Sequence, residues 1–284
     1  MSIAPLPQSG SEVEAAVARL AALLRHQQLV VLTGAGISTE SGIPDYRGPE
    51  TARRARNPMK FQAFVADPAN RARYWARAHA GWARVAGAQP NPAHQALARL
   101  EAAGRMRGLV TQNVDRLHHR AGSAQVIELH GSLHDVRCLA CGAFEPRAGL
   151  QERLARVNPG STRAVEIAPD GDAEIGAAAE ARFRVVGCLA CGGSLKPDVV
   201  FFGENVPRER VETAYAWVDE ADALLVVGSS LTVFSGFRFV KRAHAAGKPI
   251  GIVNLGPTRG DPLADVKVEG RAGEVVPALV QELL

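Results

Sequence analysis

The chain has 284 residues, which is about twice the length of a typical domain and enough to bury a large core. Hydrophobic residues make up 46% and charged residues 22% of it, a balance that excludes a disordered or collagen-like chain. The net charge is +4 and no basic run is interleaved with aromatic residues, so we expect no specific nucleic-acid partner.

The N-terminal region carries no recognisable targeting or membrane signal. Residues 1–10 lack the basic start and apolar core of a signal peptide. Residues 11–25 repeat apolar side chains at helical spacing, without the Arg-rich and Ser-rich character of a transit peptide. No apolar run approaches the roughly 20 residues of a membrane span, so we expect a cytoplasmic protein with no membrane partner.

Short runs of β-branched and apolar residues alternate with longer helical stretches. The predicted strands are Leu29–Leu32, Arg107–Val110, Val126–Leu129, Ala223–Val227, Ile250–Val253 and Val266–Val268. Their nearly continuous apolar character is typical of strands that are covered on both faces. Strands that alternate with helices predict an α/β fold, here a Rossmann-type doubly wound parallel sheet.

Two segments interrupt this alternation and predict a smaller lobe within a single domain that spans 1–284. Residues 49–82 are Arg-rich and helical, and residues 133–197 contain all four cysteines. These two segments are expected to form the smaller lobe together. The Rossmann lobe is then expected over residues 12–48, 83–132 and 198–284.

Small or polar residues follow five of the predicted strands. Because the carboxyl ends of parallel strands form one edge of a sheet, where ligands bind, we expect these segments to line a single cleft. They are Thr33-Gly34-Ala35-Gly36, Thr111-Gln112-Asn113-Val114-Asp115, His130-Gly131, Gly228-Ser229-Ser230 and Asn254-Leu255-Gly256.

The segment Gly34-Ala35-Gly36 resembles a dinucleotide-binding turn, in which glycines let the backbone approach a pyrophosphate. The full dehydrogenase pattern is absent, because Thr39 stands where the third glycine belongs and no acidic residue follows about 20 positions later. A purely structural turn is the alternative. The continuation to Gly48 favours ligand binding, since it mixes hydroxyls, glycines and an acid with Arg47, a side chain suited to clamp phosphate.

The four cysteines form two Cys-x-x-Cys pairs, which are Cys138 with Cys141 and Cys188 with Cys191. Four thiolates in this pattern are the ligand set that a structural zinc ion prefers, with no position left open for chemistry. Redox use of a pair is the alternative. The 46 residues between the pairs far exceed the usual spacing of about 15–20, so residues 142–187 are interpreted as an inserted loop.

The motifs, taken in order, resemble those of the sirtuin family over roughly residues 14–280. The similar segments are Gly34–Gly48, Thr111–Asp115 with Leu117-His118 and Ala121-Gly122, His130-Gly131, the cysteine pairs, Pro197–Glu204, Gly228–Ser230 and Asn254–Gly256. Further segments are similar to the class II branch that contains the mitochondrial sirtuin four. These are Tyr74–Arg77, Gln89–His94, Ala168–Asp172 and Gly256–Arg259.

The resemblance implies a role for most residues of the expected cleft. It assigns catalysis to His130, whose imidazole suits a general base, and to Asn113. It assigns NAD⁺ binding to Gly34, Ala35, Gly36, Ser38, Thr39, Asp45, Tyr46, Arg47, Gln112, Asn113, Val114, Asp115, His130, Gly228, Ser229, Ser230, Asn254, Leu255, Gly256 and Ala272. The acyl-lysine substrate would contact Val200, Phe201, Gly203, Val233, Tyr74 and Arg77.

Tyr74 and Arg77 have i, i+3 spacing on a predicted helix and can face the same way. In sirtuins that prefer succinyl or malonyl lysine, a Tyr-x-x-Arg pair binds the acyl carboxylate. Arg77 is therefore a candidate for admitting acidic acyl chains. A solvated surface arginine is the alternative.

The resemblance implies an NAD-dependent protein lysine deacylase. The acyl oxygen of the substrate would attack C1′ of the nicotinamide ribose and displace nicotinamide, and His130 would then activate the ribose. The products would be nicotinamide, the free lysine and 2′-O-acyl-ADP-ribose. We expect NAD⁺ as co-substrate, one structural zinc ion, acylated-lysine proteins as partners and a monomeric protein. The alternatives are a protein mono-ADP-ribosyltransferase and a catalytically silent NAD- and zinc-binding regulatory module.

Overall fold

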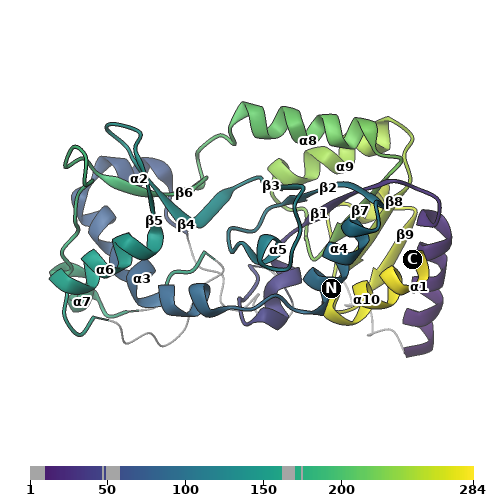
Figure 1. Cartoon of the computed structure of the whole chain (residues 1–284), viewed down its shortest axis with the longest axis horizontal. Helices are drawn as coiled ribbons and strands as arrows, with labels where there is room; N and C mark the ends of the chain where they lie inside the picture. The colour runs from purple at the N-terminus through teal and green to yellow at the C-terminus, as the bar shows by residue number, and fades with distance from the viewer. Residues whose placement is uncertain (1–9, 47, 49–57, 162–169, 174) are drawn as a thin grey trace, which may run out of the picture.

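The computed structural model describes residues 10–46, 48, 58–161, 170–173 and 175–284. A lobe built on a large sheet lies beside a smaller lobe built on a three-stranded sheet with helices around it (Figure 1). Within the described ranges, none of the helices combines the length and the apolar character needed to cross a lipid bilayer.

All six predicted strands are present in the large sheet, and every neighbouring pair is parallel. In spatial order they are β3 (Val126–Glu128), β2 (Met106–Thr111), β1 (Leu29–Thr33), β7 (Ala223–Val227), β8 (Ile250–Asn254) and β9 (Val266–Glu269). The order runs outward in opposite directions from β1 and β7, which is the doubly wound Rossmann arrangement, so the predicted fold class is confirmed. In such a sheet the crevice for ligands opens where the order reverses, above these two central strands.

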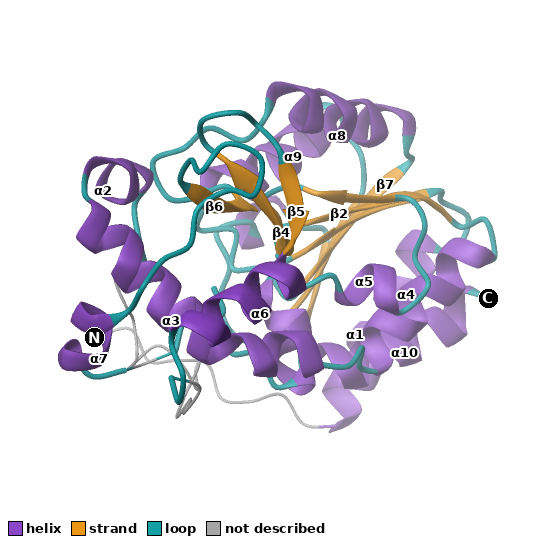
Figure 2. Ribbon diagram, turned by 60° about the vertical axis from the view of Figure 1, so that its left-hand side comes forward, coloured by secondary structure: helices purple, strands orange, loops and turns teal. Residues whose placement is uncertain are grey.

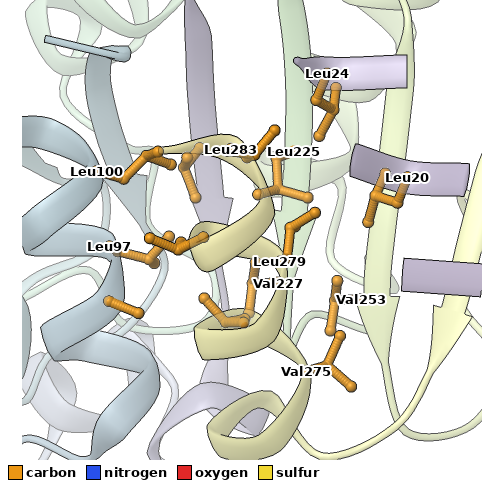
Figure 3. Packing of buried hydrophobic residues seen from close by; sticks show 14 of the residues in the cluster. Leu20, Leu24, Leu97, Leu100, Leu225, Val227, Val253, Val275, Leu279 and Leu283 are labelled. Atoms are coloured by element: carbon orange, nitrogen blue, oxygen red, sulfur yellow. The ribbon is translucent and has the colours of Figure 1, made fainter. Parts of the chain in front are cut away.

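Helices cover both faces of this sheet, as the uniformly apolar strands require (Figure 2). Side chains alternate across β1, so Leu29 and Val31 belong to one apolar cluster while Val30 and Leu32 belong to the other. The first cluster packs against α1 (Gly10–Leu24), α4 (Pro92–Ala102) and α10 (Ala272–Leu283) (Figure 3). The second packs against α8 (Arg208–Glu220) and α9 (Phe234–Ala245). Three short helices complete this lobe: η1 (Ala35–Ser41), α5 (Leu117–Arg120) and η3 (Asp261–Leu263).

The smaller lobe contains an antiparallel sheet that the sequence patterns do not predict. Its strands, in the order β5, β4 and β6, are Phe144–Pro146, Gly131–Cys138 and Leu195–Val199. Helices α2 (Phe61–Ala66), α3 (Pro68–Gly87), α6 (Arg147–Val157) and α7 (Ala177–Arg182) surround it. The segment 142–187, expected to be an inserted loop, thus contains β5, α6 and α7.

The loops after β1 and β7 touch through their backbones. The amides of Gly34 and Gly36 donate to the carbonyls of Val227 and Gly228 at 3.1 and 2.8 Å. Gly228 has a φ of +63°, and a Cβ there would lie 2.3 Å from the backbone nitrogen of Ile37. Only glycine fits such a position, because both its backbone conformation and the available space exclude a side chain.

Gly228→Ala should therefore lower the free energy of unfolding by about 2–4 kcal/mol, since the left-handed conformation and the overlap with Ile37 both add cost. Gly247→Ala is the matched control, because Gly247 has a φ of +67° but no heavy atom of the described chain within 4 Å of where its Cβ would lie. That variant should lose only about 1 kcal/mol. Urea unfolding followed by circular dichroism measures both, and equal losses would contradict the crowding argument.

Candidate functional site

A cavity of about 600 Å³ lies at the carboxyl edge of the large sheet and is lined by residues of both lobes. The predicted site residues in its lining are Gly34, Ala35, Gly36, Ser38, Asp45, Tyr46, Tyr74, Gln112, Asn113, Val114, Asp115, His130, Val200, Phe201, Gly203, Gly228, Ser229, Ser230, Val233, Asn254, Leu255 and Gly256. The structure thus brings all five predicted loops together with the predicted substrate wall.

Three predicted residues are not in that lining. Thr39 and Ala272 line a smaller recess of about 40 Å³, which shares Gly36 and Asn254 with the large cavity. Arg77 lines neither of the two. A fourth predicted residue, Arg47, lies outside the described residues.

His130 lies directly before β4, with its half-buried imidazole at the cavity. Its Nδ1 is 2.9 Å from the carbonyl oxygen of Gln112, and its Nε2 is 2.8 Å from the hydroxyl of Ser235. A carbonyl oxygen only accepts hydrogen bonds, so Nδ1 carries the proton and Nε2 keeps its lone pair. The tautomer is therefore determined by the protein itself.

Burial lowers the pKa of His130 to about 4. The positive charges of Arg210 and Arg238 act in the same direction, and the hydrogen bond to Gln112 acts against it. Because the pKa lies well below neutrality, the imidazole is uncharged at pH 7 and can accept a proton at Nε2.

A buried chain of hydrogen bonds forms the floor of the cavity. Asn113 Nδ2 donates to Ser38 Oγ at 3.0 Å, and Ser38 Oγ donates to Asp115 Oδ2 at 2.7 Å. The backbone amide of Leu117 donates to the other carboxylate oxygen at 2.9 Å. Burial raises the pKa of Asp115, while these hydrogen bonds oppose that shift. The three side chains are thereby oriented before any substrate binds.

Two buried histidines support this floor from behind. The rings of His94 and His118 lie 4.8 Å apart, and His118 Nε2 is 2.9 Å from Thr33 Oγ1. Burial lowers the pKa of His94 to about 4 and that of His118 well below its usual value, so both are uncharged at pH 7. His118 lies outside the cavity lining, and its hydrogen bond to Thr33 could not be predicted from the sequence.

Tyr74 and Arg77 do not face the cavity together. Tyr74 is buried and lines the cavity, with its ring 5.2 Å from that of Phe201. Arg77 instead places Nε 2.6 Å from Oε1 of Glu180 in α7. The acidic residue Asp170 lines the cavity as well. Among the described residues, the cavity lining thus includes the carboxyl group of Asp170 and does not include the predicted guanidinium of Arg77.

The two cysteine pairs come together in the smaller lobe. One ligand atom of each cysteine lies within 4.8 Å of all the others, and the Cys138–Cys191 and Cys141–Cys188 sulfur distances are 3.5 and 3.8 Å. Sulfurs that surround a zinc ion tetrahedrally at 2.3 Å are about 3.8 Å apart. The four thiols therefore fit the predicted metal, and as a closed four-ligand set they suit a structural role.

Ser235 and Asp170 are cavity residues for which no sequence pattern indicates a role. Ser235 lies near the start of α9 and follows no pattern that would mark it. Only its contact with His130, which is 105 positions away in the sequence, distinguishes it from other serines. Asp170 belongs to a segment noted for its resemblance but without a predicted contact.

Comparison with known proteins gives consistent matches. The model of the Sir2 family matches residues 34–235. A Mycobacterium avium protein named NAD-dependent protein deacetylase 1 is 54% identical over 270 residues, which cover 93% of this chain and 94% of the relative. A Bradyrhizobium diazoefficiens protein named NAD-dependent protein deacetylase 2 is 56% identical over 249 residues, which cover 87% of this chain and 91% of the relative.

A solved structure described as Sir2–p53 peptide–NAD⁺ has the same fold. Its TM-score is 0.74 at 32% sequence identity, and the match covers 93% of this chain and 97% of that chain. The likeness therefore extends over both lobes.

The purified protein should contain about one zinc ion per chain, and Cys141→Ser should lose it, because three thiolates no longer close the tetrahedral site. We expect the melting temperature to fall by several degrees and zinc analysis to show the loss. Ser194→Ala is the control. Ser194 is exposed, lies three residues after Cys191, and accepts a hydrogen bond from Leu139 only through its backbone carbonyl. A Cys141→Ser protein with full zinc content and unchanged melting would contradict the assignment.

Proposed function

This chain belongs to the Sir2 family, and from that premise we propose which of its residues carry out the reaction. It is an NAD-dependent protein deacetylase whose four-cysteine cluster is consistent with one structural zinc ion. We assign His130 as the general base and Asn113 as the second catalytic residue. The observation that supports this most directly is the uncharged imidazole of His130, which presents its Nε2 lone pair at the cavity.

We propose that NAD⁺ lies along the carboxyl edge of the sheet. Gly34, Gly36 and Gly228 line the large cavity with backbone alone, and the opposite loop fills the space where their Cβ atoms would lie. A pyrophosphate is proposed to bind against this backbone. The recess with Thr39 and Ala272 would take the adenosine, and its continuity with the large cavity supports this direction. Arg47 stays a predicted phosphate contact.

The polar floor suits the other end of the dinucleotide. Asn113 and Asp115 offer an amide and a carboxylate for the nicotinamide carboxamide and the ribose hydroxyls. Ser38 connects the two side chains by hydrogen bonds of 3.0 and 2.7 Å, so little reorientation is needed when the substrate enters. We assign Ser229 and Asn254 to ribose contacts on the adenosine side.

In the proposed reaction the acyl carbonyl oxygen of the substrate bonds to C1′ of the nicotinamide ribose, and the bond from C1′ to nicotinamide breaks. His130 Nε2 then takes the proton of a ribose hydroxyl, and the oxygen of that hydroxyl bonds to the acyl carbon. Water completes the release of lysine and leaves the acyl group on ADP-ribose. A pKa of about 4 keeps Nε2 unprotonated in the free enzyme at physiological pH.

The peptide substrate is proposed to lie between the segment Val200–Gly203 and Val233. An extended peptide can form backbone hydrogen bonds with such edges. Recognition then depends on the buried acyl-lysine more than on the surrounding peptide sequence. The backbone amide of Val200 donates to the carbonyl of His130 at 2.8 Å, so the peptide wall and the proposed base are directly connected. The relative solved with a p53 peptide supports a peptide substrate.

We further propose that the chain is a bacterial-type relative of the sirtuin four branch, on the four segments that resemble it. The described part of one of them, Asp170–Asp172, packs directly on α3, since a Cβ on Gly81 would lie 2.0 Å from the carbonyl oxygen of Gly171. This segment helps to form the cavity near Tyr74. A monomeric state and a cytoplasmic location stay predictions.

His130→Ala should lower kcat/KM for an acetyl-lysine peptide by about 10²–10⁴-fold, because no other base would replace the lost Nε2. NAD⁺ affinity, measured by calorimetry, should change only a few-fold. His244→Ala, at an exposed histidine in the last turn of α9, should behave like the unmodified enzyme. Mass spectrometry of the peptide reads the product directly. Full turnover by His130→Ala would refute the assignment, and a gained ADP-ribose in place of a lost acetyl group would indicate transfer to the peptide.

Acetyl-lysine should be preferred over succinyl-lysine, because Asp170 lines the cavity and Glu180 holds Arg77 away from it. Glu180→Gln weakens that hold, so the ratio of succinyl to acetyl turnover should rise roughly twofold to fivefold. Glu212→Gln is the matched control, since Glu212 forms a similar pair with Arg208, and both of these side chains are exposed on α8. An unchanged or lower ratio in Glu180→Gln would remove Arg77 from acyl selection.

A further inference from the structure

The hydroxyl of Ser235 is the nearest partner of the proposed catalytic nitrogen. Ser235 Oγ lies 2.8 Å from Nε2 of His130, and both side chains line the large cavity. Ser235 is the second residue of α9, which begins at Phe234 after the extended residue Val233. The contact therefore joins the start of a helix of the Rossmann lobe to the residue that precedes β4.

The direction of this hydrogen bond follows from the other ring nitrogen. Nδ1 donates to the carbonyl of Gln112 at 2.9 Å, so Nε2 is unprotonated and can only accept. The Ser235 hydroxyl must then be the donor. In the free enzyme, the Ser235 hydroxyl thus occupies the single lone pair of Nε2 and holds the imidazole in the uncharged form.

The packing of α9 against the side chain of Gln112 determines where Ser235 lies. The next residue, Gly236, is pressed against the side chain of Gln112, since a Cβ on Gly236 would be 2.6 Å from Gln112 Nε2. The Gln112 side chain is held in turn by Ser229, whose hydroxyl donates to Gln112 Oε1 at 2.7 Å. Gln112 therefore positions His130 through its carbonyl oxygen and α9 through its side chain. Gln112 thus sets the separation between Ser235 and His130.

Two positively charged side chains act on His130. Arg210 of α8 and Arg238 of α9 lower its pKa, as does burial. Arg210 lies 3.4 Å from Asp198 of β6, which also pairs with Arg137. These charges disfavour an imidazolium, so a proton taken by Nε2 needs an additional acceptor close by. A serine hydroxyl can serve, because it rotates and offers lone pairs as well as a proton.

We propose that Ser235 is a positioning residue for the base, donating to Nε2 in the resting enzyme and accepting from it after proton transfer. The Ser235 hydroxyl first rotates away from the Nε2 lone pair, the proton then moves from the ribose hydroxyl to Nε2, and Ser235 keeps its own proton and accepts from the new N–H. No bond to Ser235 forms or breaks. This role rests on the proposed function of His130 and adds to it a residue that stabilises both protonation states in turn.

The order of the reaction provides the test. Nicotinamide leaves before His130 acts, so exchange of labelled nicotinamide into NAD⁺, measured with the acetyl peptide present, reports a step that needs no base. Formation of the deacetylated peptide needs the base. Ser235→Ala should lower kcat for the product about tenfold, as expected for one lost hydrogen bond to a charged group, with KM and the exchange rate within about twofold. Alanine is a better helix former than serine, so the fold should be retained.

Ser235→Thr keeps the hydroxyl and should restore most of the product rate. Thr213→Ala is the control, because its exposed hydroxyl bonds only a carbonyl within α8. A normal product rate in Ser235→Ala would overturn the proposal, as would an equal loss of product formation and exchange, which indicates a structural defect. His130→Ala separates the test of Ser235 from the test of His130 as the base. If it blocks product formation but not exchange while Ser235→Ala changes nothing, the base assignment stands and the role of Ser235 fails. If it leaves product formation intact, the base assignment itself fails.

Discussion

The cleft depends on one backbone contact, in which Gly36 meets Gly228 at the ends of the two central strands. Strands β1 and β7 belong to opposite halves of the sheet, and their loops must turn away from each other to open a crevice. Where these loops leave their strands, a backbone hydrogen bond of 2.8 Å from Gly36 to Gly228 joins them. The large cavity lies next to this junction, and both glycines line it. Ser38 and Ser229 follow these glycines in the chain and line the same cavity.

In the polar floor of the cleft, hydrogen bonds orient the side chains before a substrate binds and limit the free-energy cost of burying them. Asn113, Ser38 and Asp115 are all buried, and an unpaired polar group in such a place costs about 1–3 kcal/mol. Their mutual hydrogen bonds offset that penalty, and the uncharged rings of His94 and His118 fill the space behind them. The floor is therefore rigid without being charged on every side, and Asp115 is the one acid within it.

Much of the fold could be predicted from the sequence, because the large sheet is encoded locally. Each strand is a short apolar run, and the polar residues after it are adjacent in the chain, so both the six strands and the loops of the cleft can be recognised by position. The smaller sheet could not be recognised in this way because β4 reads Gly-Ser-Leu-His-Asp-Val-Arg-Cys, with no clear alternation of apolar and polar residues. Pairings such as Ser235 with His130 or Arg77 with Glu180 join residues over 100 positions apart, and periodicity carries no information about them.

Strand β4 begins directly after His130 and ends at Cys138 of the four-cysteine cluster. Gly131 pairs with Val199 at one end, and Cys138 pairs with Leu195 at the other. The eight residues of β4 span about 23 Å, so one strand connects the cavity with the cysteine cluster. An oxidant or chelator that reaches the exposed sulfurs of Cys141 and Cys191 would disturb the cysteine cluster at the C-terminal end of this strand. A change at the cysteine cluster would therefore act on the strand that begins directly after His130, although none of the described side chains that line the cleft is itself a thiol.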